Sequence, residues 1–216
     1  MFADWKRKMI LPSIITALAI AVAAGIWWYR DWNVQQKDAQ MKKMIWINDA
    51  ADKPAADFRL TDQNGKPISL SEYKGKVVVL QFMDPVCTDI CPIVSQEAIM
   101  ADREMGDKSK QVEFIAVNVN EYHLSQQDVM QFSQSHGLNT LPNWHFVTGD
   151  KASLQAVWKA FGIEVIPNPD GDVEHSADMY FIDKQGKERY VAYPDNDQKS
   201  ISQWGKGIAY FAEKLM

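Results

Sequence analysis

Runs of consecutive apolar residues alternate along the chain with segments in which apolar residues recur at helical spacing. The runs at 76–82 and 112–119 show no alternation of apolar and polar positions. This is typical of strands that are covered on both faces of a sheet. Helices are predicted at 92–105, 125–136, 150–161 and 201–215.

Two further patterns indicate antiparallel hairpins. Residues 58–60 and 68–70 flank a turn that contains Asn64-Gly65, and such turns need the positive backbone angles that these residues tolerate. Residues 179–182 and 188–192 flank a second polar turn, and residues 144–147 form one more short strand. This order of strands and helices predicts an α/β sandwich with a mixed central β-sheet.

The segment from Met9 to Tyr29 carries no charged residue and is 21 residues long. At about 1.5 Å per residue a helix of this length spans the roughly 30 Å core of a bilayer. Lys6, Arg7 and Lys8 precede it, so the positive-inside rule places the N-terminus in the cytoplasm and the rest of the chain across the membrane. We therefore expect one N-terminal transmembrane helix.

A cleaved signal peptide is the alternative, because Ala21-Val22-Ala23 resembles a small-residue cleavage site. We prefer an uncleaved anchor, since the apolar run continues past that site into Trp27, Trp28 and Tyr29. Either way the rest of the chain is exported, to the periplasm if the cell is a bacterium. The expected organisation is a cytoplasmic N-terminus at 1–8, a transmembrane signal-anchor at 9–29, a juxtamembrane linker at 30–55 and one domain at 56–216.

Composition and charge exclude several classes of protein. Of the 216 residues 46% are hydrophobic and 24% are charged, as in ordinary folded proteins. Residues 1–29 hold three basic side chains and one acidic side chain, which leaves 20 basic and 27 acidic side chains, a net charge of −7, for the rest. No basic run could follow a phosphate backbone, so we expect no nucleic-acid partner.

The chain has only two cysteines, Cys87 and Cys91, and both follow directly on the predicted strand 76–82 and begin a helix. Sites in α/β proteins lie at such carboxyl ends of strands. The unpaired N–H groups at the start of a helix favour a thiolate and lower the pKa of a nearby cysteine. A spacing of four brings both sulfurs close enough to form a disulfide or to bind one soft metal ion such as copper(I) or zinc. An inert structural disulfide would close too short a loop to contribute much stability.

A metal needs a third ligand, and the chain has four histidines. For His123, His136 and His145 we expect a capping, surface or packing role. His175 precedes the strand 179–182, and in a thioredoxin-type topology that loop faces the cysteine pair. We therefore expect His175 to be the third ligand.

The motif Cys87-Thr88-Asp89-Ile90-Cys91-Pro92, with Glu174-His175-Ser176 about 84 residues later and Tyr180-Phe181-Ile182-Asp183 after it, resembles the Sco/SenC family of copper-binding, thioredoxin-like proteins. The resemblance covers roughly residues 56–215. The extra residue between the cysteines distinguishes the motif from the commoner Cys-x-x-Cys of thioredoxins.

The resemblance implies a membrane-anchored copper chaperone that binds one copper ion, Cu(I) or Cu(II), through Cys87, Cys91 and His175. It also implies a partner: the copper-bearing subunit of cytochrome c oxidase, which such proteins help to assemble, or another copper donor or acceptor. The family usually has Pro and Asp where this chain has Thr88 and Glu174, and residues 118–122 replace an acidic run of the family.

Two enzymatic alternatives use the same cysteines. In a thiol–disulfide oxidoreductase Cys87 would attack a substrate disulfide and Cys91 would resolve the mixed disulfide. Thioredoxin-type reductases carry a proline just before the strand that follows, where this chain has Ser176-Ala177, which favours the metal-binding hypothesis. A peroxiredoxin-like peroxidase is disfavoured, because Asp84 stands where its threonine is expected. For the methionines Met83, Met100, Met105 and Met179 we expect core packing rather than copper ligation.

Overall fold

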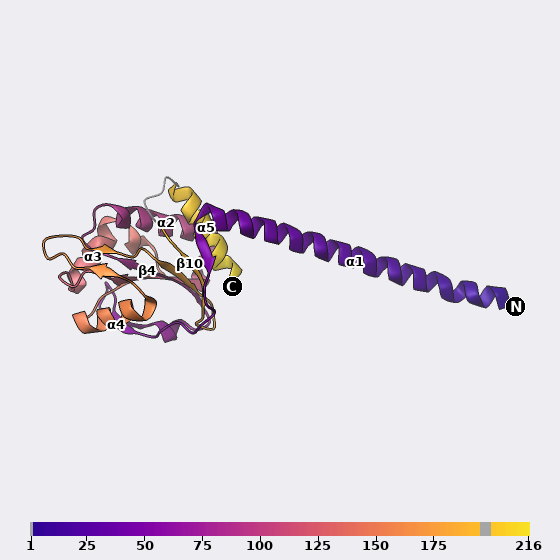
Figure 1. Ribbon diagram of the computed structural model, residues 1–216, viewed down its shortest axis with the longest axis horizontal. Coiled ribbons are helices and arrows are strands. Elements are labelled where there is room, and N and C mark those ends of the chain that lie inside the picture. Colours follow the sequence, from indigo (N-terminus) through magenta and orange to yellow (C-terminus); the bar gives the residue numbers. More distant parts are fainter. Residues whose placement is uncertain (1, 195–199) are drawn as a thin grey trace. The chain divides into compact units, whose positions relative to one another are not determined.

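The computed structural model describes residues 2–194 and 200–216, with side chains from residue 16 onward (Figure 1). The chain divides into two compact units, Met1–Met41 and Lys42–Met216. The first unit belongs to helix α1 (Phe2–Met44). Among the helices whose side chains the structure describes, none is both long and apolar enough to cross a bilayer. Residues 1–15, which include the start of the predicted anchor and its three basic residues, lie outside that part of the chain.

The second unit is built on a six-stranded mixed sheet with the strand order β1-β10-β9-β4-β5-β6. β4, β5 and β6 are parallel, whereas β9, β10 and β1 each pair antiparallel with their neighbours. The bounds of these strands are β1 Ile47–Asp49, β4 Val77–Met83, β5 Val112–Asn118, β6 Trp144–Val147, β9 Met179–Ile182 and β10 Glu188–Ala192. The predicted α/β fold with a mixed central sheet is confirmed.

Two small hairpins lie outside this sheet. β2 (Arg59–Thr61) pairs with β3 (Pro67–Ser69), as the Asn-Gly turn predicts. β7 (Val165–Ile166) pairs with β8 (Glu174–His175) through only two residue pairs. This second hairpin is not predicted from the sequence, although its turn contains Asn-Pro-Asp-Gly, a strong turn signal.

Helices cover both faces of the sheet. α2 and α5 lie on one face and α4 on the other (Figure 1). The bounds of the helices in this unit are α2 Ile90–Met105, α3 Gln126–Ser135, α4 Lys151–Phe161 and α5 Ile201–Lys214, with 3-10 turns at Leu70–Tyr73, Gly106–Gln111 and Leu138–Thr140. All four helices lie where the apolar periodicity predicts them.

Burial of the central strands on both faces explains the layered core. Leu80 and Phe82 of β4 pack with Tyr180 of β9 and with Trp158 and Phe161 of α4 in one buried cluster. Because every residue of β4 and β5 is buried, both strands are covered on two faces, as their unbroken apolar runs predict. Because β4 and β5 are parallel neighbours, their carboxyl ends lie side by side at one edge of the sheet.

The structured domain begins upstream of the predicted boundary at residue 56. Strand β1, which lies in the predicted linker, pairs with β10, and Ile45 and Ile47 are almost completely buried. The polar composition of this segment suggests a linker. In the folded chain, the burial of the two isoleucines and the pairing of three residues with β10 stabilise it as a strand.

Candidate metal and thiol site

The cysteines lie where β4 ends and α2 begins. The loop from Asp84 to Asp89 connects the two elements, and the backbone N–H of Cys87 donates to the carbonyl of Asp84 at 3.3 Å. Cys91 lies in the first turn of α2 and is 2% exposed, whereas Cys87 precedes the helix and is 9% exposed. Cys87 is thus the thiol nearer the surface.

The two thiols are free and differ strongly in acidity. A hydrogen bond from Cys91, supported by backbone N–H groups at the start of α2 and opposed by burial, lowers the pKa of Cys87 to about 6. The same hydrogen bond, together with burial, raises the pKa of Cys91 well above its usual range. At neutral pH Cys87 is therefore a thiolate, and the Cys91 thiol keeps its proton and donates a hydrogen bond to the Cys87 sulfur.

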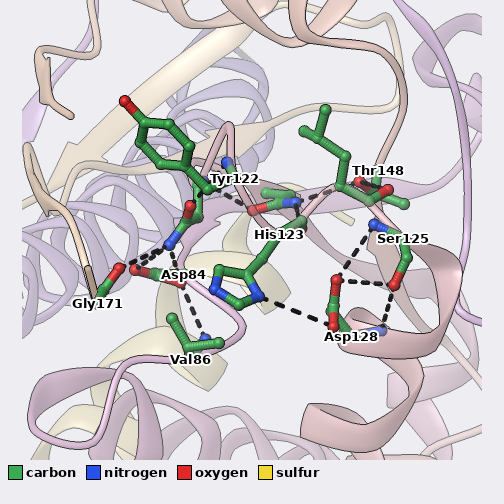
Figure 2. A network of polar contacts seen from close by, with 11 residues as sticks. Asp84, Val86, Tyr122, His123, Ser125, Asp128, Thr148 and Gly171 are labelled. Atoms are coloured by element: carbon green, nitrogen blue, oxygen red, sulfur yellow. Dashed lines mark hydrogen bonds and ion pairs between the residues drawn. The ribbon is translucent and has the colours of Figure 1, made fainter. Parts of the chain in front are cut away.

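A fully buried carboxylate, Asp84, holds the loop that carries Cys87 (Figure 2). Its Oδ1 accepts the backbone N–H of Val86 at 2.9 Å, and its Oδ2 accepts the backbone N–H of Val173 at 2.8 Å. The side-chain amide of Asn120 donates to both oxygens, at 3.2 and 3.1 Å, and also to the carbonyl of Gly171 at 3.2 Å. One carboxylate therefore joins the cysteine loop, the loop after β5 and the loop that leads to His175.

A second buried amide extends this network. Asn118 donates to the carbonyl of His123 at 2.7 Å and to Thr148 Oγ1 at 3.2 Å, and it accepts the backbone N–H of Asn120 at 2.8 Å (Figure 2). The Trp158 indole donates to the Asn118 carbonyl at 2.9 Å. Asn118 and Asn120 thus hold the loop after β5 in place. Sequence reasoning missed Asp84 and Asn120 as positioning residues, and their only signal is their place after two neighbouring buried strands.

His175 lies on β8 and is partly buried. Its Nδ1 is 2.9 Å from the carbonyl oxygen of Ser176. Because a carbonyl only accepts hydrogen bonds, Nδ1 carries the proton and the lone pair of the neutral ring is on Nε2. Metal-binding histidines are held in this way. Burial raises the pKa of the nearby Asp178, and the adjacent His175 partly opposes that shift.

The structure brings together the two cysteines but not a complete ligand set. Within the part of the chain that it describes, no three His, Cys, Asp or Glu side chains are placed to hold a metal ion. The loop before His175 is nevertheless tied to the cysteine loop through Asp84 and Val173. The donor types of Cys87, Cys91 and His175 suit a soft ion such as copper(I).

The other histidines lie away from β8 and make contacts of their own. His145 is buried between two carboxylates, with Nδ1 3.1 Å from Asp62 and Nε2 3.3 Å from Glu113. His123 lies 3.9 Å from Asp128, and His136 ends α3. The buried methionines Met83, Met105 and Met179 belong to the core, as expected.

Comparison with known families decides the relationship. A family model described as SCO1/SenC matches residues 48–207. The chain belongs to the SCO1/SenC family. It is 25% identical over 145 residues to a SCO1 protein homolog of Bacillus subtilis. The alignment covers 65% of this chain and 74% of the relative. The thiol–disulfide oxidoreductase ResA of the same species is 39% identical over 93 residues, 43% of this chain and about half (48%) of ResA.

The fold of this SCO1/SenC protein is also that of solved relatives. A structure of Bradyrhizobium japonicum ScoI with copper bound superposes with a TM-score of 0.62 at 23% identity, covering 76% of this chain and 100% of ScoI. A thioredoxin domain of a thiol–disulfide oxidoreductase from Bacteroides vulgatus superposes with a TM-score of 0.54 at 18% identity, covering 76% of this chain and 96% of that domain. The predicted thioredoxin-like sandwich is therefore confirmed.

Proposed function

We propose that this protein is a copper chaperone that binds one copper ion through Cys87, Cys91 and His175 and delivers it to the copper-bearing subunit of cytochrome c oxidase. The observation that carries the proposal is a close thiol pair at the start of α2, with the pKa of Cys87 lowered to about 6, in a chain of the SCO1/SenC family. In this role the chaperone releases its ion to a client without turnover.

Each ligand contributes in a way that its environment supports. The Cys87 thiolate binds the soft ion first, and coordination of Cys91 then releases the proton that its raised pKa retains. His175 offers Nε2 because Ser176 holds its Nδ1 proton. The two-pair hairpin that carries His175 moves to close the site over the metal, while Asp84 keeps the loop before it in contact with the cysteine loop.

The proposal includes an N-terminal anchor at residues 9–29 that places the domain in the periplasm of a bacterial cell. The uncharged run and the basic residues before it support this arrangement. A fusion of alkaline phosphatase to the C-terminus tests it, because that enzyme folds actively only outside the cytoplasm. An inactive fusion, or a chain released from membranes by alkaline carbonate, would contradict the anchored, exported arrangement.

Titration of the reduced protein with copper(I) in the presence of a competing chelator tests the ligand set. We expect one tightly bound equivalent, lost in Cys87→Ser and Cys91→Ser and weakened in His175→Ala by about 10–100-fold. His123→Ala is the matched control and should bind like the wild type, because His123 pairs with Asp128. An unchanged affinity in His175→Ala would remove that residue from the site.

A second function, thiol–disulfide exchange, is favoured by the split acidity of the two thiols and by the similarity to ResA. In this reaction Cys87 attacks a client disulfide and displaces one client thiolate. Cys91 then attacks the Cys87 sulfur and releases the second thiolate, so the client is reduced and the protein is oxidised to the Cys87–Cys91 disulfide. An external dithiol must reduce the protein again.

The Cys91→Ser variant separates the two functions. It cannot resolve a mixed disulfide, so it should trap a disulfide-bonded peptide on Cys87, whereas Cys87→Ser traps nothing. If the wild type reduces such a peptide but binds no copper(I), the oxidoreductase hypothesis is correct and the chaperone hypothesis fails.

A further inference from the structure

A pocket of about 360 Å³ opens beside Cys87, between the cysteine loop and α3. Cys87 lines it, but Cys91 does not. A client that approaches through this pocket therefore meets Cys87 first. The remaining lining residues are Pro85, Val86, Thr88, Pro92, Asp128, Gln131, Phe132, Ser135 and His136.

The wall opposite the cysteine loop contains one side chain that can bind a soft metal in the neutral state, His136. Its ring stacks on the buried ring of Phe132, with the centroids 4.1 Å apart and the planes 29° from parallel. Its Nδ1 is 2.9 Å from the carbonyl oxygen of Phe132, so Nδ1 carries the proton and Nε2 keeps its lone pair. His136 is thus held in the same way as His175, although it lies on a different element.

His136 is also fixed relative to the cysteines. Its carbonyl accepts the side-chain amide of Gln96 at 3.1 Å, and Gln96 belongs to α2, the helix whose first turn contains Cys91. This bond ties the end of α3 to α2, and Pro92 in the first turn of α2 lines the pocket together with His136. The position of the imidazole does not depend on the hairpin that carries His175.

We propose that this pocket is the copper-transfer site, in which Cys87 Sγ and His136 Nε2 hold copper(I) together while a thiol, thioether or imidazole of the client enters. This inference rests on the proposed chaperone function and adds the route by which the copper ion leaves the protein. The bonds from copper to Cys91 and His175 break, and the bonds to His136 and the client form. Cys91 takes up one proton, which an entering client thiol supplies or, for a thioether or imidazole, the solvent, and the copper stays in the same oxidation state. The pocket volume is at the lower end of the range for small-ligand sites, enough for one client side chain.

Transfer kinetics of a His136→Asn variant test the proposal. Asparagine can still donate to the Phe132 carbonyl and so keeps the end of α3, but it removes the imidazole ligand. The full-length protein, loaded with one copper(I), is mixed with a synthetic acceptor peptide that contains two cysteines and one methionine. We expect an unchanged equilibrium affinity for copper(I) and a second-order transfer rate constant about tenfold lower than in the wild type.

His123→Asn is the matched control, because His123 is also partly exposed but does not line the pocket. It should transfer copper at the wild-type rate. Equal rates for His136→Asn and the wild type, or equal slowing of both variants, would overturn the proposal. A lowered copper(I) affinity of His136→Asn would also overturn it, because His136 would then belong to the resting site. A wild-type protein that binds no copper(I) would instead refute the proposed function, so the two failures are distinct.

Discussion

The backbone N–H of Val173 donates to the carboxylate of Asp84 at 2.8 Å, across 89 positions of sequence. This bond connects the loop before His175 with the loop before Cys87. Because the carboxylate is fully buried and also accepts from Val86 and Asn120, it fixes the two loops relative to each other. The geometry of the proposed ligand set therefore depends on a residue that is not itself a ligand.

Replacing Asp84 by Asn should destabilise the domain by about 1–3 kcal/mol, because an amide would direct a donor at the donating amide of Asn120. The copper(I) affinity should fall about tenfold, since the loops would no longer be held together. Urea denaturation and chelator competition measure these effects. The double variant Asp84→Asn/Asn120→Asp restores an acceptor–donor pair between the two side chains. A stability of Asp84→Asn equal to that of the wild type would contradict the assigned role.

The low pKa of Cys87 predicts how its reactivity depends on pH. Alkylation of Cys87 by iodoacetamide should rise with pH with a midpoint near 6, because only the thiolate reacts. In Cys91→Ala the midpoint should rise, since the main cause of the shift is the hydrogen bond from Cys91. Cys91→Ser keeps a donor and is the matched control. An identical midpoint in the wild type and in Cys91→Ala would show that the helix start alone sets the pKa.

The same shift predicts a contribution of Cys87 to stability that depends on pH. The pKa in the folded chain lies below the usual value near 9, so ionisation of Cys87 favours the folded state. This contribution is fully present above about pH 9 and is lost as the pH falls through about 6. Chemical denaturation of the wild type and of Cys87→Ser at pH 5 and pH 9 measures it. The difference between the two proteins should be larger at pH 9.

Packing of Ile45 on α5 predicts that the domain needs residues upstream of 56. A Cβ on Gly207 would overlap the side chain of Ile45, so Gly207→Ala should destabilise the domain by about 1–3 kcal/mol. Ile45→Ala should cost about 2–5 kcal/mol, since that side chain is fully buried. In the double variant the two losses should not add, because the smaller side chain at 45 leaves room for the methyl group. Full additivity, measured by thermal or urea unfolding, would contradict this contact.

Replacement of His145 should lower the stability of the protein, whereas replacement of His175 should lower its copper(I) affinity. His145→Ala leaves the buried carboxylates of Asp62 and Glu113 with one partner fewer, so it should lower the free energy of unfolding by about 1–3 kcal/mol and leave the copper(I) affinity unchanged. His175→Ala should weaken copper binding and leave the stability of the metal-free protein unchanged. Equal loss of copper affinity in both variants would indicate a general effect of folding.

Much of the fold could be predicted because its main elements have strong local signals. The strands 144–147, 179–182 and 188–192 have the predicted bounds, and α3 begins after Ser125, whose side chain caps it. Strand β1 could not be predicted, because a three-residue segment with one buried side chain forms a strand only where the edge of β10 is available. Its stability comes from tertiary contacts, which local propensity does not describe.

The place of the cysteine pair after β4 could be predicted from the sequence, but the hydrogen bonds that hold the surrounding loops could not. The spacing of Cys87 and Cys91 and the position of His175 pointed to metal or thiol chemistry. The roles of Asp84 and Asn120 depend on hydrogen bonds between segments that are 36 to 89 positions apart. No local pattern records such contacts, so only the folded chain shows which polar residues support the ligands.

The hairpin that carries His175 has a consequence for the energetics of release. Only two residue pairs join β7 to β8, whereas β9 lies between two partner strands in the centre of the sheet. Elements with so few contacts open locally at a free energy well below that of global unfolding. In native-state hydrogen exchange the amide of Ser176, bonded to Glu164, should therefore exchange much faster than that of Phe181. If His175 binds the metal, it can therefore dissociate from the ion by local opening of this hairpin while the central sheet that carries the cysteine loop stays folded.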